Sequence, residues 1–198
     1  MEEYKMIIAG IIGSAITLLI TAIIDYFKEI HRSKLEKDKL VFQRKTDAAE
    51  KAMSWYQESA DCLMMMQTAC SDMGGTYDPI IWTKLMQSAS QADQLYKETS
   101  LRLNPLYLYF DFRKIEEKHN IYTSMQFVNA ALAKIGEYDE QAKQLRLNGE
   151  YDDSKDIIEL KDKSTRLFHE LSKALKEQIK SIAAIQEELR NQYNKYSN

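Results

Sequence analysis

Apolar residues recur at steps of three and four along most of the chain, a spacing that predicts α-helices. From residue 25 to residue 73 nothing interrupts a helix, and Gly74-Gly75 then ends it. Asp78-Pro79 predicts the start of a second helix, because an aspartate side chain can cap the first turn and proline is accepted there.

Three further helices follow from the same reasoning. Asn104-Pro105 repeats the start signal and predicts a helix over 106–112, although the alternation Leu-Tyr-Leu-Tyr in this segment also fits a strand. Longer helices are predicted over about 120–147, closed by Asn148-Gly149, and over about 154–196. Short connections favour antiparallel neighbours, so we expect an all-α antiparallel bundle with coiled-coil-like packing.

The positions expected to face the core follow the apolar stripe of each helix. They are Ala49, Met53, Tyr56, Ala60, Leu63, Gln67 and Cys70; Ile81, Leu85, Ser88, Ala92, Leu95 and Thr99; Ile121, Met125, Val128, Leu132 and Ile135; and Leu160, Ser164, Leu167, Leu171, Leu175, Ile182, Ile185 and Leu189. Such stripes are typical of helices that pack side by side.

The first helix begins with an apolar run. Residues 7–24 contain no charge and no proline, and 18 residues would rise about 27 Å, close to the roughly 30 Å of a bilayer core. The acidic start, with Glu2 and Glu3, differs from the basic start of a cleaved signal peptide. The sequence therefore predicts one N-terminal transmembrane helix within residues 1–27, continuing into a helical bundle over 28–198.

Basic residues set the predicted orientation of this span. Only Lys5 precedes it, whereas five basic residues follow closely: Lys28, Arg32, Lys34, Lys37 and Lys39. By the positive-inside rule, the bundle lies in the cytoplasm and the N-terminus lies outside the inner membrane.

The long first helix also contains both cysteines and a run of three methionines. Cys62 and Cys70 are eight positions apart, a separation too large for a disulfide within one helix, so we expect buried, reduced thiols. Met64, Met65 and Met66 together cover most of a helix circumference. They are either core residues or an adaptable contact surface.

One face of the predicted span gathers small and polar residues. Gly10, Gly13, Ser14, Thr17 and Thr21 fall within about 100° of arc, and Asp25 follows beside this stripe. In one interpretation the stripe is a packing contact between spans. In the other, four or more copies enclose a water-filled path lined by the hydroxyl groups. Both interpretations require self-association.

Composition and motifs argue against several other classes of protein. With 27 basic and 30 acidic residues the net charge is −3, which does not favour general nucleic-acid binding. His31, His119 and His169 belong to no metal-ligand or catalytic motif, and no glycine-rich loop follows a strand. We therefore predict a protein that is not an enzyme and uses no metal or cofactor.

One cluster could bind a ligand. Aromatic residues alternate with leucines and are followed by basic residues, and such a mixture can stack bases and hold phosphates. The alternative is a core segment next to a solvated face. The cluster consists of Tyr107, Tyr109, Phe110, Phe112, Arg113, Lys114 and Lys118.

A single N-terminal span with a Gly10, Ser14, Thr17 and Thr21 face, joined to a helical domain, resembles the small membrane effectors of bacterial antiphage defence. That resemblance implies a cytoplasmic module that responds to a nucleotide or oligonucleotide signal and spans that permeabilise the membrane. We therefore expect an oligomeric, signal-gated pore or depolarising effector, a tetramer or larger, in the lipid bilayer. The alternative is a membrane-tethered coiled-coil scaffold that recruits a protein partner.

The chain is also similar in architecture to the LemA type of membrane protein, but lacks its Arg-rich segment after the span.

Overall fold

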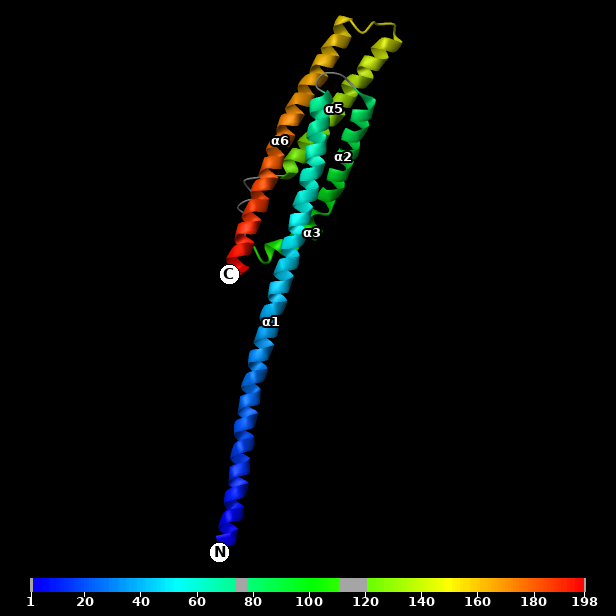
Figure 1. Ribbon diagram of the computed structural model, residues 1–198. Helices are drawn as coiled ribbons and strands as arrows, with labels where there is room; N and C mark the ends of the chain where they lie inside the picture. The colour runs from blue at the N-terminus through cyan, green and yellow to red at the C-terminus, as the bar shows by residue number, and fades with distance from the viewer. Residues whose placement is uncertain (1, 74–77, 111–120, 198) are drawn as a thin grey trace. The chain divides into compact units, whose positions relative to one another are not determined.

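The computed structural model describes residues 2–73, 78–110 and 121–197, and their side chains except those of 2–16, 100, 121–124, 196 and 197. All regular secondary structure in these residues is α-helical (Figure 1). The helices are α1 (Glu2–Met73), α2 (Pro79–Lys97), α3 (Thr99–Tyr107), α5 (Ile121–Leu147) and α6 (Lys155–Ser197). The all-α prediction is confirmed.

The chain divides into two compact units, Met1–Asp47 and Ala48–Asn198. The first unit consists of the N-terminal part of α1. The second contains the rest of α1 together with α2, α3, α5 and α6, and most of its buried apolar residues form one core.

The predicted transmembrane span is not supported. Among the residues that the structure describes, no helix has an apolar stretch sufficient to cross a bilayer. The apolar run of the sequence is followed by charged residues at Asp25, Lys28 and Glu29. The prediction of a single-pass inner-membrane protein with its N-terminus outside is therefore wrong.

In the second unit, α1 is buried on two faces. The predicted stripe is confirmed at Ala49, Tyr56, Ala60, Leu63 and Cys70, which are all buried. A neighbouring stripe is buried as well: Ala52, Trp55, Ser59, Cys62, Met66, Ala69 and Met73. The helix packs against α2 on one side and α6 on another, as its hydrogen bonds to both helices show (Figure 1). A helix between two neighbours needs a wider apolar surface than one stripe provides.

The start of α2 is built as predicted. Asp78 Oδ1 accepts hydrogen bonds from the amides of Ile80 (2.7 Å) and Ile81 (3.4 Å), and Pro79 occupies the first turn. These bonds satisfy amides that have no partner within the helix.

The predicted helix over 106–112 is not what the described residues show. The chain is already helical from Thr99, Pro105 lies inside α3, and α3 ends at Tyr107. Arg102 N bonds to Glu98 O at 3.2 Å, so the helical turn is established before Asn104-Pro105 is reached. The start signal was therefore misread, because a proline near a helix end removes only one hydrogen bond.

A tight connection joins α5 to α6. Gly149 has φ +94°, and the amides of Gly149 and Glu150 donate to the carbonyls of Arg146 and Leu145 at 3.1 and 3.0 Å. This pair of bonds is a Schellman motif, which ends α5 where Asn148-Gly149 predicted. The chain then turns into α6, whose buried residues include Leu171, Leu175, Ile182, Ile185 and Leu189, as expected.

Candidate functional site

The residues predicted to line the span are only partly described. Gly10, Gly13 and Ser14 lie outside the residues whose side chains the structure describes. Thr21 Oγ1 donates to the carbonyl of Thr17 at 2.9 Å, so this hydroxyl bonds to its own helix. Asp25 lies 3.7 Å from Lys28 in an exposed ion pair one turn along the helix. Both contacts are local to α1 and join residues one turn apart.

The predicted ligand-binding cluster is also divided. Tyr107 and Tyr109 pack against the core of the second unit. Arg113, Lys114 and Lys118 lie outside the described residues. The described aromatic residues of the cluster therefore contribute to packing, and the binding of a ligand by the whole cluster stays a prediction.

The first unit presents an uninterrupted apolar surface, which we call the N-terminal apolar face. Its members are exposed, and at 100° per residue they fall within about 140° of arc. They are Leu19, Ile20, Ile23, Ile24, Phe27 and Ile30. The opposite side holds charged residues, including the ion pair of Arg32 with Glu36 at 3.1 Å.

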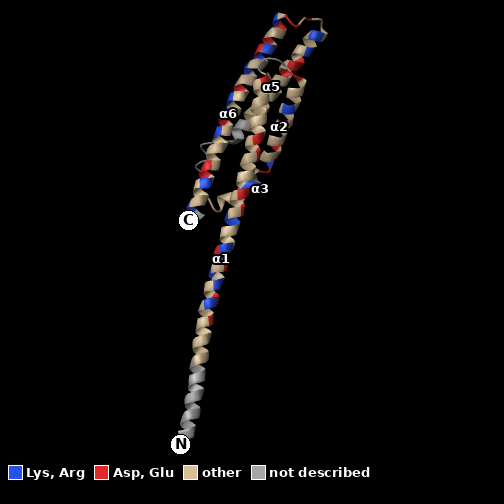
Figure 2. Cartoon of the chain, viewed as in Figure 1, with Lys and Arg blue, Asp and Glu red and all other residues tan. Residues whose placement is uncertain are grey.

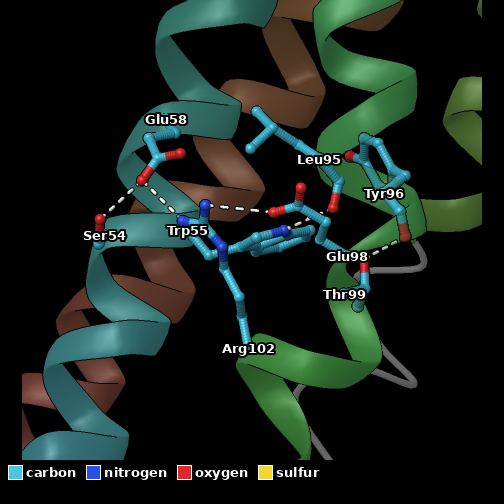
Figure 3. Close-up of polar contacts among 8 residues, drawn as sticks. All are labelled: Ser54, Trp55, Glu58, Leu95, Tyr96, Glu98, Thr99 and Arg102. Carbon is cyan, nitrogen blue, oxygen red and sulfur yellow. Dashed lines mark hydrogen bonds and ion pairs between the residues drawn. The ribbon is translucent and has the colours of Figure 1, made fainter.

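A polar network joins α1 to the α2–α3 corner (Figure 3). Arg102 Nη1 donates to Glu58 Oε1 at 2.8 Å, and Arg102 Nη2 lies 3.2 Å from Glu98 Oε2. Ser54 donates to the same oxygen of Glu58 at 2.7 Å. Beside this network Trp55 Nε1 donates to the carbonyl of Leu95 at 2.8 Å.

The charges in this network stabilise one another. The hydrogen bond from Ser54, and then the contacts of Arg102, lower the pKa of Glu58 below its ordinary value. The hydrogen bond from Arg102 to Glu58, followed by the charges of Glu58 and Glu98, raises the pKa of Arg102. Both groups therefore stay ionised near neutral pH. We assign this network a structural role, the fixing of α3 against α1.

Both cysteines are buried free thiols, as predicted. Burial raises the pKa of Cys70 to about 12 and also raises that of Cys62, where Asp61 and Glu58 add to the effect. A protonated, buried thiol is a poor nucleophile. Of the three methionines, Met66 is buried and Met64 and Met65 are exposed.

A cavity lies between α5 and α6 and was not foreseen in the sequence. Its volume is about 470 Å³. Met73, Tyr138 and Phe168 line it together with three basic residues, Lys143, Arg146 and Lys161. The turn at Asn148-Gly149 brings the end of α5 beside the start of α6, so basic residues on both sides of that turn were the available signal.

No cluster of at least three histidine, cysteine, aspartate or glutamate side chains suited to a metal ion occurs among the residues described. Comparison with protein-family models, with curated proteins and with solved structures finds no match to this chain.

Proposed function

We propose that this protein is a self-associating α-helical scaffold. Two copies meet through the N-terminal apolar face, and the bundle of the second unit is available to a protein partner. The observation that supports this proposal is the row of exposed apolar side chains from Leu19 to Ile30. Contiguous apolar surface of this kind is typical of interaction sites.

The spacing along this face suits another helix as the partner. Ile20, Ile23, Phe27 and Ile30 follow steps of three, four and three, which is the seam of a coiled coil. Lys34 and Lys37 continue the same register with charges, so the seam is restricted to about two heptads. An identical helix offers the same seam and is the simplest complement to it.

The pore predicted from the sequence needs a helix that crosses the bilayer, and the described part of the chain contains none. A scaffold needs no such helix. Its assembly requires only an apolar contact in water, which the hydrophobic effect drives in proportion to the buried apolar area.

The bundle offers a separate surface for a partner. Met64 and Met65 on α1 are exposed, and so is Met86 on α2. α1 and α2 run antiparallel (Figure 1), and Trp55 on α1 bonds to Leu95 on α2. Met64 and Met86 each lie nine positions from that contact, in the same direction along the bundle, so Met86 is near the level of Met64. Exposed methionines adapt readily to different partners.

Self-association is tested by sedimentation equilibrium of the full-length protein over a range of concentrations. Ile20→Glu places a charge in the seam and is expected to shift the protein to monomer. Leu18→Glu is the matched control, because Leu18 is 71% exposed, against 52% for Ile20, and lies on the opposite side of the helix. Equal masses for wild type and Ile20→Glu at every concentration would contradict the proposal.

A further inference from the structure

The cavity between α5 and α6 results from the unequal lengths of the helices. Ser71 on α1 lies 3.0 Å from Ser172 on α6, and α1 ends two residues later at Met73. The hairpin of α5 and α6 continues past that level, so α1 no longer fills the space beside it (Figure 1). Met73 lines the cavity where α1 ends.

The cavity has a cationic side near the α5–α6 turn. Arg146 Nε donates to Asp152 Oδ1 at 2.8 Å, and Lys161 Nζ lies 3.5 Å from the same oxygen. Two cations from different helices thus converge on one carboxylate oxygen of the connecting loop. Figure 2 shows the acidic residues of this connection between basic residues of the two helices.

Among the charged side chains that line the cavity, three are basic (Lys143, Arg146 and Lys161) and one is acidic (Asp139). Lys143 contributes a third cation and pairs with Asp139 at 2.8 Å. The ion-pair partners of these cations are Asp139 and Glu140 for Lys143, at 2.8 and 3.9 Å, and Asp152 for both Arg146 and Lys161. Apart from Asp139, which is 22% exposed, these side chains are at least 40% exposed, and exposed pairs are weak and readily exchanged.

The other side of the cavity is apolar and aromatic. Tyr138, Leu160 and Phe168 line it, together with Ser164 and Thr165. Its volume of about 470 Å³ suits a small molecule, since ligand pockets commonly have about 300–1,000 Å³.

We propose that this cavity binds a small organic phosphate. The phosphate group replaces the Asp152 carboxylate between Arg146 and Lys161, and the organic part lies against Tyr138 and Phe168. A phosphate monoester suits this site better than a carboxylate, because its charge approaches −2 and it offers three acceptor oxygens to the converging cations. In the free protein Asp152 holds the two cations in place and competes with the ligand. This proposal does not depend on self-association.

The test is isothermal titration of the full-length protein with phenyl phosphate, which combines the two chemistries. Lys161→Gln and Arg146→Gln are each expected to weaken binding about tenfold, the loss typical of one charge-assisted hydrogen bond. Asp152→Asn removes the competing charge and is expected to tighten binding. Inorganic phosphate is expected to bind more weakly than phenyl phosphate, because it cannot use the apolar wall.

Lys163→Gln is the matched control. Lys163 lies two residues after Lys161 on the same helix, is similarly exposed, and pairs with Glu159 at 2.7 Å outside the cavity. Its substitution is expected to leave the affinity unchanged. The proposal is overturned if wild type and Asp152→Asn both fail to bind phenyl phosphate at millimolar concentration. It is equally overturned if Lys163→Gln weakens binding as much as Lys161→Gln, or if Asp152→Asn weakens it.

Discussion

Glu58 and Arg102 lie 44 positions apart in the chain and meet at 2.8 Å, with Arg102 Nη1 donating to Glu58 Oε1. Glu58 belongs to α1 and Arg102 to α3, so this ion pair fastens a nine-residue helix to the longest one. The adjacent bond from Trp55 to Leu95 holds the end of α2 against the same turn of α1 (Figure 3). Together these contacts set the α2–α3 corner.

Trp55→Phe is expected to destabilise the second unit by about 1–3 kcal/mol. The substitution keeps an aromatic ring beside Tyr56 and Tyr96, but removes the indole donor from the carbonyl of Leu95. Chemical denaturation followed by circular dichroism measures the change. Leu101→Ala, at an exposed position of α3, is the control and is expected to have little effect. A midpoint shift as small as that of the control would show that the indole bond contributes nothing.

The Glu58–Arg102 pair is expected to contribute at most about 1 kcal/mol, because both side chains remain partly exposed. Its contribution depends on pH with a defined sign. The pKa of Glu58 is lowered in the folded protein, so its stabilising effect is present above the ordinary value of 4.5 and is lost as the pH falls through the folded value.

The measurement compares wild type with Glu58→Gln by denaturant unfolding at several pH values. The difference in free energy of unfolding is expected to be constant near neutral pH and to shrink below about pH 4.5. A difference that grows on acidification would contradict the lowered pKa.

Local signals in the sequence predict much of this fold. Asp78-Pro79 and Asn148-Gly149 set a helix start and a helix end through bonds within a few residues, and both are found where expected. Asn104-Pro105 fails because Arg102, already bonded to Glu98, extends a turn that begins at Thr99. The local pattern does not reveal how far upstream a helix has started.

Features that depend on several helices at once were not predictable in the same way. Trp55, Ser59 and Met66 are buried because α1 has neighbours on two sides, a fact that one apolar stripe does not contain. The cavity beside Arg146 and Lys161 depends on where α1 ends relative to α6. The contacts of α1 with Ser172 of α6 fix that position, and they join side chains more than 100 positions apart in the chain. The apolar run at residues 7–24 was overread for a different reason. The run predicts a span from its apolar composition, but the described part of the chain contains no helix that is long and apolar enough to cross a bilayer.

Cys70 is expected to make the protein sensitive to alkaline pH. Its pKa is raised from 9.0 to about 12 by burial, so the thiol stays protonated in the folded state while it ionises in the unfolded chain. The stability that this difference provides is complete below pH 9.0 and is lost as the pH rises toward about 12. Cys70→Ala removes the contribution of Cys70, whereas that of Cys62, whose pKa is also raised, remains in both proteins.

The measurement is the change in free energy of unfolding between about pH 8 and pH 10, under reducing conditions, for wild type and Cys70→Ala. Wild type is expected to lose more stability than the variant over this range. Identical losses would show that Cys70 does not titrate differently in the two states. Alkylation by iodoacetamide provides a second readout, in which Cys70 reacts only as fast as the bundle opens.

The two glycines Gly136 and Gly149 are expected to respond to alanine with opposite signs, although the space around both is open. A Cβ atom added at either position would meet no atom within 4 Å, so crowding plays no part in the comparison. Gly136 lies inside α5, where alanine restricts the unfolded chain and favours the helix, with an expected gain of about 0.5–1 kcal/mol. Gly149 has φ +94°, a left-handed conformation that alanine adopts only with strain, so Gly149→Ala is expected to cost about 1–2 kcal/mol. Thermal unfolding of the two variants beside wild type measures both changes, and Gly136→Ala serves as the internal control for the added methyl group. Stabilisation by both substitutions would mean that the Schellman turn does not hold Gly149 in the left-handed region. It would also contradict the position of the cationic side of the cavity, because that turn positions it through Asp152.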